Sequence, residues 1–121
     1  MTTIAGPDFI TLLVSDLEKS YKFYKNQIGL RDSPEKQPNA YAFDTKPCGL
    51  AIRKASDGAP KNENPGQGIV IFLRTSDATA VHAGLKERAV PIVEALRKSP
   101  FGMTFSFRDP DGYVMVVHDG G

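Results

Sequence analysis

The sequence predicts an α+β fold built from two tandem βαβββ modules, and three observations support this. A β-rich run changes to a helical period over residues 9–28, and the same change recurs over 69–89. The Ser-Asp pairs at 15–16 and 76–77 and the glycines at 49 and 112 repeat at offsets of 61 and 63 residues. A chain of 121 residues suits one hydrophobic core and is too short for two independent ones. We therefore expect duplicated modules within a single domain over residues 1–121.

The composition is that of an ordinary globular domain, with 40% hydrophobic and 24% charged residues. A net charge of +1 gives no electrostatic footprint for nucleic acid or for an anionic membrane. The apolar runs are far shorter than the roughly 20 residues of a membrane helix, and the N-terminus has no targeting pattern. The lone Cys48 excludes an internal disulfide and fits a reducing compartment. We expect a cytoplasmic protein that binds a small molecule rather than nucleic acid or membrane.

The first module is expected over about residues 8–54. Residues 9–14 are β-rich, and apolar side chains then recur every three or four positions up to Ile28, as in an amphipathic helix. Ser15 and Glu18 have the spacing of a capping box at the start of this helix, and Gly29 supplies a left-handed stop. About three strands should follow the helix; the β-like segments are residues 39–44 and 49–53.

A linker of about residues 55–67, rich in Gly, Pro, Asn and charge, should precede the second module, which is expected over about 68–118. Its strand at 69–73 leads into a helix with one apolar face. The charged stretch 94–98 precedes Phe101-Gly102-Met103, which we expect to be a loop able to fold over a binding site. Further strands are expected at residues 90–93, 103–108 and 113–117, with a structural turn at residues 109–112.

Two motifs carry a resemblance to a known family. Residues 8–24 with Ile28-Gly29-Leu30 resemble the opening module of the vicinal oxygen chelate superfamily, which includes glyoxalase-type lyases, extradiol dioxygenases and the bleomycin- and fosfomycin-resistance proteins. Residues 107–113 similarly resemble its closing signature. The resemblance covers almost the whole chain and implies curved mixed sheets around a cleft that a second subunit commonly completes. A homodimer is therefore expected, while the chemistry stays open because one scaffold hosts many activities.

Metal-dependent members of this superfamily hold a divalent ion with His, Glu or Gln on the strands that face the cleft. The resemblance places the four ligand positions at Phe9, at Ala51 or Arg53, at Val70 and at Val116. None of these side chains is an ordinary ligand for a hard cation. The residues next to them are equally unsuited, so a register shift of one residue leaves the result unchanged. We expect no bound metal and no cofactor.

The same alignment assigns the cleft face of each strand, because residues two apart point to the same side. The aromatic side chains would give flat apolar contact, and the arginines would recognise an anionic or carbonyl-bearing ligand. Alternatively, each arginine lies along an apolar wall or pairs with a nearby carboxylate. His118 either edges the cleft or is a solvated histidine, and His82 is expected to be structural. The predicted ligand-binding residues are Phe9, Thr11, Arg53, Phe72, Arg74, Phe101, Val116 and His118.

The leading hypothesis is a metal-free small-molecule-binding protein, similar to the bleomycin-resistance proteins, which would give antibiotic resistance by sequestering an aromatic or amphipathic compound. The resistance proteins use an acidic cleft for a cationic drug, so the arginines argue against bleomycin itself. The enzyme alternative is a glyoxalase-type lyase or a dioxygenase-like protein, which needs metal ligands that the sequence lacks. A metal-free enzyme would need His118 or a carboxylate with a shifted pKa as its acid or base. The last alternative is a purely structural partner domain.

Overall fold

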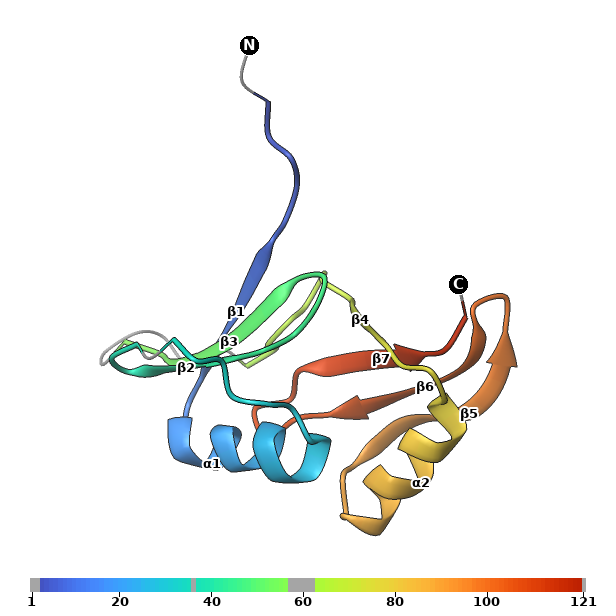
Figure 1. The fold of residues 1–121 in the computed structure, drawn as a ribbon. Helices are drawn as coiled ribbons and strands as arrows, with labels where there is room; N and C mark the ends of the chain where they lie inside the picture. Colours follow the sequence, from blue (N-terminus) through green and yellow to red (C-terminus); the bar gives the residue numbers. More distant parts are fainter. Residues whose placement is uncertain (1–2, 36, 57–62, 121) are drawn as a thin grey trace. The chain divides into compact units, whose positions relative to one another are not determined.

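The computed structural model describes residues 3–35, 37–56 and 63–120 of the chain. The fold divides into two compact units, residues 1–59 and 60–121. Within the described ranges it is an α+β fold with seven strands in two mixed sheets. The predicted fold class is thereby confirmed. Figure 1 labels these elements along the chain. Residues 57–62 of the expected linker lie outside the described residues.

The first unit is a small sheet with one helical segment. Strand β1 lies parallel to the central strand β3, and β2 pairs with β3 in the antiparallel direction. The α-helix α1 continues directly into the π-helix η1. The elements are β1 (Phe9–Val14), α1 (Leu17–Lys22), η1 (Phe23–Ile28), β2 (Ala40–Phe43) and β3 (Gly49–Lys54).

The ends of this helical segment have clear local causes. Asp16, rather than the expected Ser15, is the N-cap of α1: its Oδ1 accepts a hydrogen bond from the Lys19 N–H at 3.1 Å. A carboxylate there also interacts favourably with the helix dipole. At the other end, Gly29 adopts a left-handed conformation with φ 92°, which confirms the predicted stop. The expected helix is therefore present, with its cap displaced by one residue.

The sheet of the first unit has a covered and an open face. Leu12 and Val14 of β1 are buried on the helix side together with Tyr24 and Ile52. Thr11 and Leu13, which alternate with them along the strand, are exposed on the opposite face. This is the alternation expected of a strand with one face against helices. The open face is therefore set by sequence parity.

The first unit has a shorter sheet than a complete βαβββ module. Two strands, β2 and β3, follow the helix in the described residues. Between the helical segment and β3, the described residues also form the isolated bridges Asp32↔Phe43 and Gln37↔Ala40. Prolines at 34 and 38 flank this segment and cannot donate ladder hydrogen bonds, which explains the interrupted pairing.

The second unit has a larger sheet, in the strand order β4-β7-β6-β5. Strand β4 is parallel to β7, and the other neighbours are antiparallel. Helix α2 begins at an N-cap, Asp77, whose Oδ1 accepts from the Ala80 N–H at 3.0 Å. The elements are β4 (Ile71–Arg74), α2 (Ala78–Glu87), β5 (Ile92–Ser99), β6 (Gly102–Arg108) and β7 (Val114–His118).

The loop expected at residues 101–103 is instead a tight turn and the start of a strand, and the charged stretch 94–98 before it belongs to an edge strand. The charged stretch lies within β5, Pro100 and Phe101 form a tight turn, and Met103 already belongs to β6. Irregular register between β5 and β6 interrupts the alternation of side chains that normally identifies a strand. Charged side chains are common on such edges because they discourage pairing with other chains.

Helix α2 covers one face of this sheet, as Figure 1 shows for the region of β5 and β6. The core between them includes Leu85, Phe105, Phe107 and Met115, all almost completely buried. The turn after β6 is structural, as predicted: Asp109 is buried, and its Oδ1 accepts from three backbone N–H groups at residues 111–113.

In the parts of the chain that the structure covers, no helix is both long and apolar enough to cross a membrane.

Candidate functional site

The open face of the second sheet carries a cavity of about 250 Å³. Its base is formed by strands β4, β6 and β7, and its wall by β5 and the turn at Pro100 and Phe101. The lining combines two exposed aromatic rings with charged and hydroxyl side chains. The lining residues are Phe72, Glu94, Arg97, Ser99, Pro100, Phe101, Thr104, Phe105 and Val116.

Three rings from separate elements meet beside this cavity. The ring centroids of Phe72 and Phe101 are 6.4 Å apart, and His118 lies 6.0 Å from Phe72 and 6.3 Å from Phe101. All three pairs are close to edge-to-face, a favourable aromatic geometry. Phe72 and Phe101 nevertheless keep 55% of their surface exposed. The cluster presents apolar area that a ligand can still cover.

Strand register explains how these residues meet. Phe72 of β4 lies opposite Val116 of β7, and Arg74 lies opposite His118, so all four belong to the same face. The structure thus brings together four of the predicted ligand-binding residues: Phe72, Phe101, Val116 and His118. The Nδ1 atom of His118 is buried and has no hydrogen-bond partner among the described residues. Buried polar atoms without a hydrogen-bond partner are uncommon in folded proteins.

Sequence reasoning missed the charged side of the cavity, formed by Glu94 and Arg97 of β5. Glu94 lies opposite Ser106 and Arg97 opposite Thr104 in the β5–β6 ladder. The Ser106 hydroxyl contacts Glu94 Oε1 at 3.4 Å. The sequence does contain a hairpin pattern, in which a turn with a proline separates two extended runs. The irregular register of β5 breaks the alternation of its side chains, so the pattern does not show which of them face the cavity. The structure therefore adds an acidic and a basic residue to the candidate site.

Arg74 makes a backbone contact. Its Nη1 donates to the carbonyl oxygen of Gly120 at 2.6 Å. Neighbouring Asp119 accepts from the Ala78 N–H through Oδ2 and from the Met103 N–H through Oδ1, both at 2.9 Å. The Ala78 hydrogen bond is the main cause of a lowered pKa at Asp119. Together these bonds attach residues 119–120 to helix α2 and to the start of β6.

The remaining predicted residues lie on the open face of the first unit. Phe9 is 49% exposed, and its ring covers Gly49: a Cβ there would lie 2.5 Å from Phe9 Cδ2. Thr11 pairs with Ala51 on the same face, and Arg53 pairs with Leu13. Arg53 also borders an open, polar hollow with residues 38–39 and 54–56. This face is mainly apolar with a basic edge.

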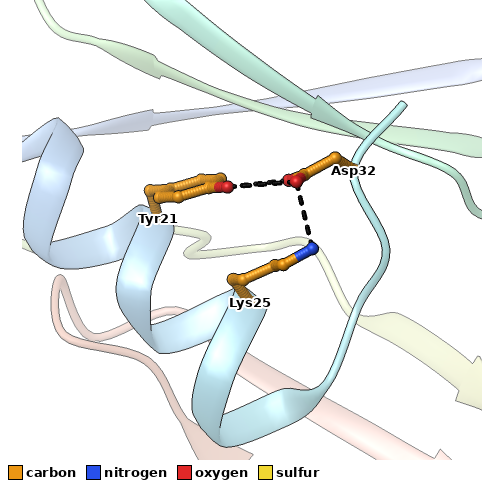
Figure 2. Close-up of polar contacts among 3 residues, drawn as sticks. All are labelled: Tyr21, Lys25 and Asp32. Carbon is orange, nitrogen blue, oxygen red and sulfur yellow. Dashed lines mark hydrogen bonds and ion pairs between the residues drawn. The ribbon is translucent and has the colours of Figure 1, made fainter. Parts of the chain in front are cut away.

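A second polar cluster, shown in Figure 2, lies at the helical segment of the first unit. The Tyr21 hydroxyl donates to Asp32 Oδ1 at 2.9 Å, and Lys25 Nζ lies 3.0 Å from Asp32 Oδ2. The hydrogen bond to Asp32 is the main reason why the pKa of Tyr21 is raised. The Tyr21 ring also stacks on Tyr41, with centroids 4.0 Å apart. These contacts attach the chain after the helix to the helix itself and are structural.

The residues present do not fit a divalent metal. The ligand positions implied by the resemblance carry Phe9, Ala51 or Arg53, Val70 and Val116, and none offers a carboxylate or imidazole. Across residues 3–35, 37–56 and 63–120, no group of three or more His, Cys, Asp or Glu side chains is arranged to hold a metal ion. No reaction step through a metal can be built from these side chains.

Comparisons with known proteins agree with this architecture. The chain is 28% identical over 113 residues to the glutathione transferase FosA of Serratia marcescens, which covers 92% of this chain and 78% of that protein. It superposes on TnmS3, an antibiotic binding protein from Streptomyces sp. CB03234, with a TM-score of 0.76, 26% identity and full coverage of both chains. A glyoxalase/bleomycin resistance protein from the same organism gives a TM-score of 0.69 at 27% identity, covering 94% of this chain and 100% of that one.

The family model described as Glyoxalase/Bleomycin resistance protein/Dioxygenase superfamily matches residues 6–117, almost the whole chain. The match spans the described parts of both units, from the segment before β1 to the end of β7. The resemblance noted in the opening and closing motifs is thereby confirmed. The chain belongs to the Glyoxalase/Bleomycin resistance protein/Dioxygenase superfamily.

Proposed function

We propose that this protein binds an aromatic or amphipathic small molecule without chemical conversion and without a metal, and so sequesters it. The observation that carries the proposal is the cluster of Phe72, Phe101 and His118 beside the cavity of the second unit. Two exposed phenylalanine rings in contact with each other are costly in water unless a partner covers them. An aromatic ligand placed over Val116 would cover both rings.

The dimensions of the site support a ligand of limited size. Drug-sized molecules occupy sites of about 300–1,000 Å³, and this cavity has about 250 Å³. It therefore accommodates a fused two-ring portion of a ligand, while the remainder extends along the open face of the sheet. The similarity to TnmS3, an antibiotic binding protein, supports an antibiotic as the natural ligand. The lyase or dioxygenase alternative lacks support because the residues do not fit a metal.

The test is a calorimetric titration with 2-naphthylmethanol, a neutral two-ring probe. Phe72→Ala should weaken binding by about 1–3 kcal/mol, the range for losing a buried aromatic contact. Val93→Ala is the matched control, since Val93 is an exposed apolar residue of β5 outside the cavity lining. Absence of binding by the parent protein, or equal losses in both variants, would contradict the proposal.

We also propose that the protein is a homodimer and acts in the cytoplasm. Strands β1 and β4 are edge strands of their sheets and expose Phe9, Leu13 and Phe72. An unpaired edge strand can pair with another chain, and exposed apolar side chains on the open sheet faces favour covering by a second copy. The single cysteine suits a reducing compartment.

A further inference from the structure

We propose that Arg97 makes the protein selective for aromatic ligands that carry an anionic oxygen group, such as a sulfonate, carboxylate or ionised phenol. This inference rests on the proposed binding function and names the ligand class of the same cavity. Arg97 lines the cavity together with Phe72 and Phe101, so a guanidinium and two aromatic rings surround one space. An anionic group attached to a two-ring system would meet both.

Arg97 is available for this role. The described residues offer its guanidinium no carboxylate within ion-pair distance and no hydrogen-bond acceptor. Arg74, the arginine expected from the sequence, instead donates to the carbonyl oxygen of Gly120. A guanidinium presents several N–H donors in a planar fork that matches two anionic oxygens. Arg97 can therefore form a bidentate contact without breaking an existing bond.

Glu94, the acidic residue of the cavity, does not cancel this selectivity. Its partner in the ladder, Ser106, is two residues from Thr104, the partner of Arg97. Two residues along a strand span about 7 Å. The Glu94 carboxylate also accepts from the Ser106 hydroxyl, whose Oγ in turn accepts from the Glu94 N–H. The Glu94 carboxylate is thus engaged by Ser106, and among the described residues it forms no ion pair with Arg97.

The position of Arg97 supplies a matched control. Neighbouring Lys98 lies opposite Met103, so it points to the other face of β5, and it does not line the cavity. Removing the Lys98 charge changes the net charge and the edge strand in the same way as removing the Arg97 charge. Any difference between Arg97→Met and Lys98→Met therefore reports the contact of Arg97 with the ligand.

The experiment compares naphthalene-2-sulfonate with neutral 2-naphthylmethanol and cationic 2-naphthylmethylammonium by calorimetry. The parent protein should bind the sulfonate most tightly. Arg97→Met should weaken sulfonate binding about five- to twentyfold, because solvent partly screens the charge-assisted hydrogen bonds, and should leave the neutral probe within about twofold. Arg97→Lys should recover part of the loss, and Lys98→Met should change neither affinity.

The outcomes separate this inference from the proposed function. Selection by Arg97 would be refuted if the parent protein bound all three probes with equal affinity. It would also be refuted if Arg97→Met weakened binding of the neutral and the anionic probe equally. Aromatic binding would remain intact in both cases. Tightest binding of the cation, abolished by Glu94→Gln, would assign selectivity to the acidic residue instead. Failure of every probe to bind would refute the proposed function itself.

Discussion

Asp119 shows how one side chain can join three segments. It accepts backbone hydrogen bonds from Ala78, at the start of α2, and from Met103, near the start of β6. Both bonds favour the ionised carboxylate, which is why its pKa lies below the ordinary value of 3.8. The cavity wall at Phe101 lies two residues before Met103, so Asp119 stabilises the neighbourhood of the candidate site.

Asp119→Asn should remove part of the acid sensitivity of the fold. A carboxyl group with a lowered pKa contributes stability that is complete above its ordinary pKa near 3.8 and is lost as the pH falls through the lowered value. The parent protein should therefore lose more stability than Asp119→Asn between about pH 4 and pH 2. Urea unfolding across this range measures the difference. Parallel pH profiles for the two proteins would contradict the assignment.

Gly120→Ala should disturb the cavity wall from outside. A Cβ at Gly120 would collide with the backbone of Phe101 and Gly102, neither of which can move without shifting the β5–β6 turn. We expect lower thermal stability and weaker binding of 2-naphthylmethanol, because the Phe101 ring would be displaced. Gly29→Ala is the control for a general effect of an added methyl group. A Cβ at residue 29 would meet open space, and the backbone strain caused by its positive φ would be confined to the first unit. Unchanged probe binding in Gly120→Ala would contradict the packing described.

The two helices share one start signal, a Ser-Asp pair in which Asp is the cap. Asp77→Ala should lower the free energy of unfolding by about 1 kcal/mol, because the Ala80 N–H loses its acceptor. Ser76→Ala should have little effect. Chemical denaturation of both variants tests the assignment, and the reverse order of effects would move the cap to the serine.

Tyr21 of α1 and Lys25 of η1 attach the first helical segment to the chain that follows it through Asp32. Tyr21→Phe should lower stability below about pH 10, because Asp32 loses a hydroxyl donor but keeps Lys25. A raised tyrosine pKa means that the stability is present below the ordinary value of 10.0 and lost as the pH rises through the folded-state pKa. Thermal denaturation at pH 7 and at pH 11 should thus show a smaller difference between the two proteins at the higher pH.

At the scale of the whole molecule, we expect self-association through the open sheet faces. Light scattering at micromolar concentration should give about twice the chain mass of 13.2 kDa. Leu13→Arg should shift the population towards the monomer, because Leu13 is 54% exposed on the open face of β1. Lys22→Glu, an exposed site on the helical side, is the control. A parent protein that stays monomeric would remove the shared-face proposal.

Removal of any bound metal tests the proposal that the protein binds its ligand without one. Dialysis against a chelator should leave both the melting temperature and the affinity for 2-naphthylmethanol unchanged, because no carboxylate or imidazole occupies the family ligand positions. Elemental analysis showing one tightly held transition metal per chain, together with a loss of affinity after dialysis, would favour the enzyme alternative.

The sequence by itself determined the duplicated strand-to-helix architecture, the faces of β1 and β4 and the turn at Asp109. These features depend on side-chain periodicity, on residues with special backbone preferences and on local hydrogen bonds, all of which operate over a few neighbours. The predicted roles of Phe72, Phe101, Val116 and His118 in ligand binding stay proposals. Strand parity alone was enough to assign Phe72, Val116 and His118 to one face, whereas Phe101 lies in a turn.

Only the tertiary structure decided the charged side of the cavity. Irregular pairing of β5 with β6 leaves Arg97 in the cavity lining with Phe72 and Phe101, and Arg74 donates to the carbonyl oxygen of Gly120, 46 residues away. Side-chain periodicity predicts neither of these placements, because each depends on which segments the folded sheet brings together. Local chemistry therefore specified the elements of this protein, whereas long-range packing selected the arginine that faces the cavity.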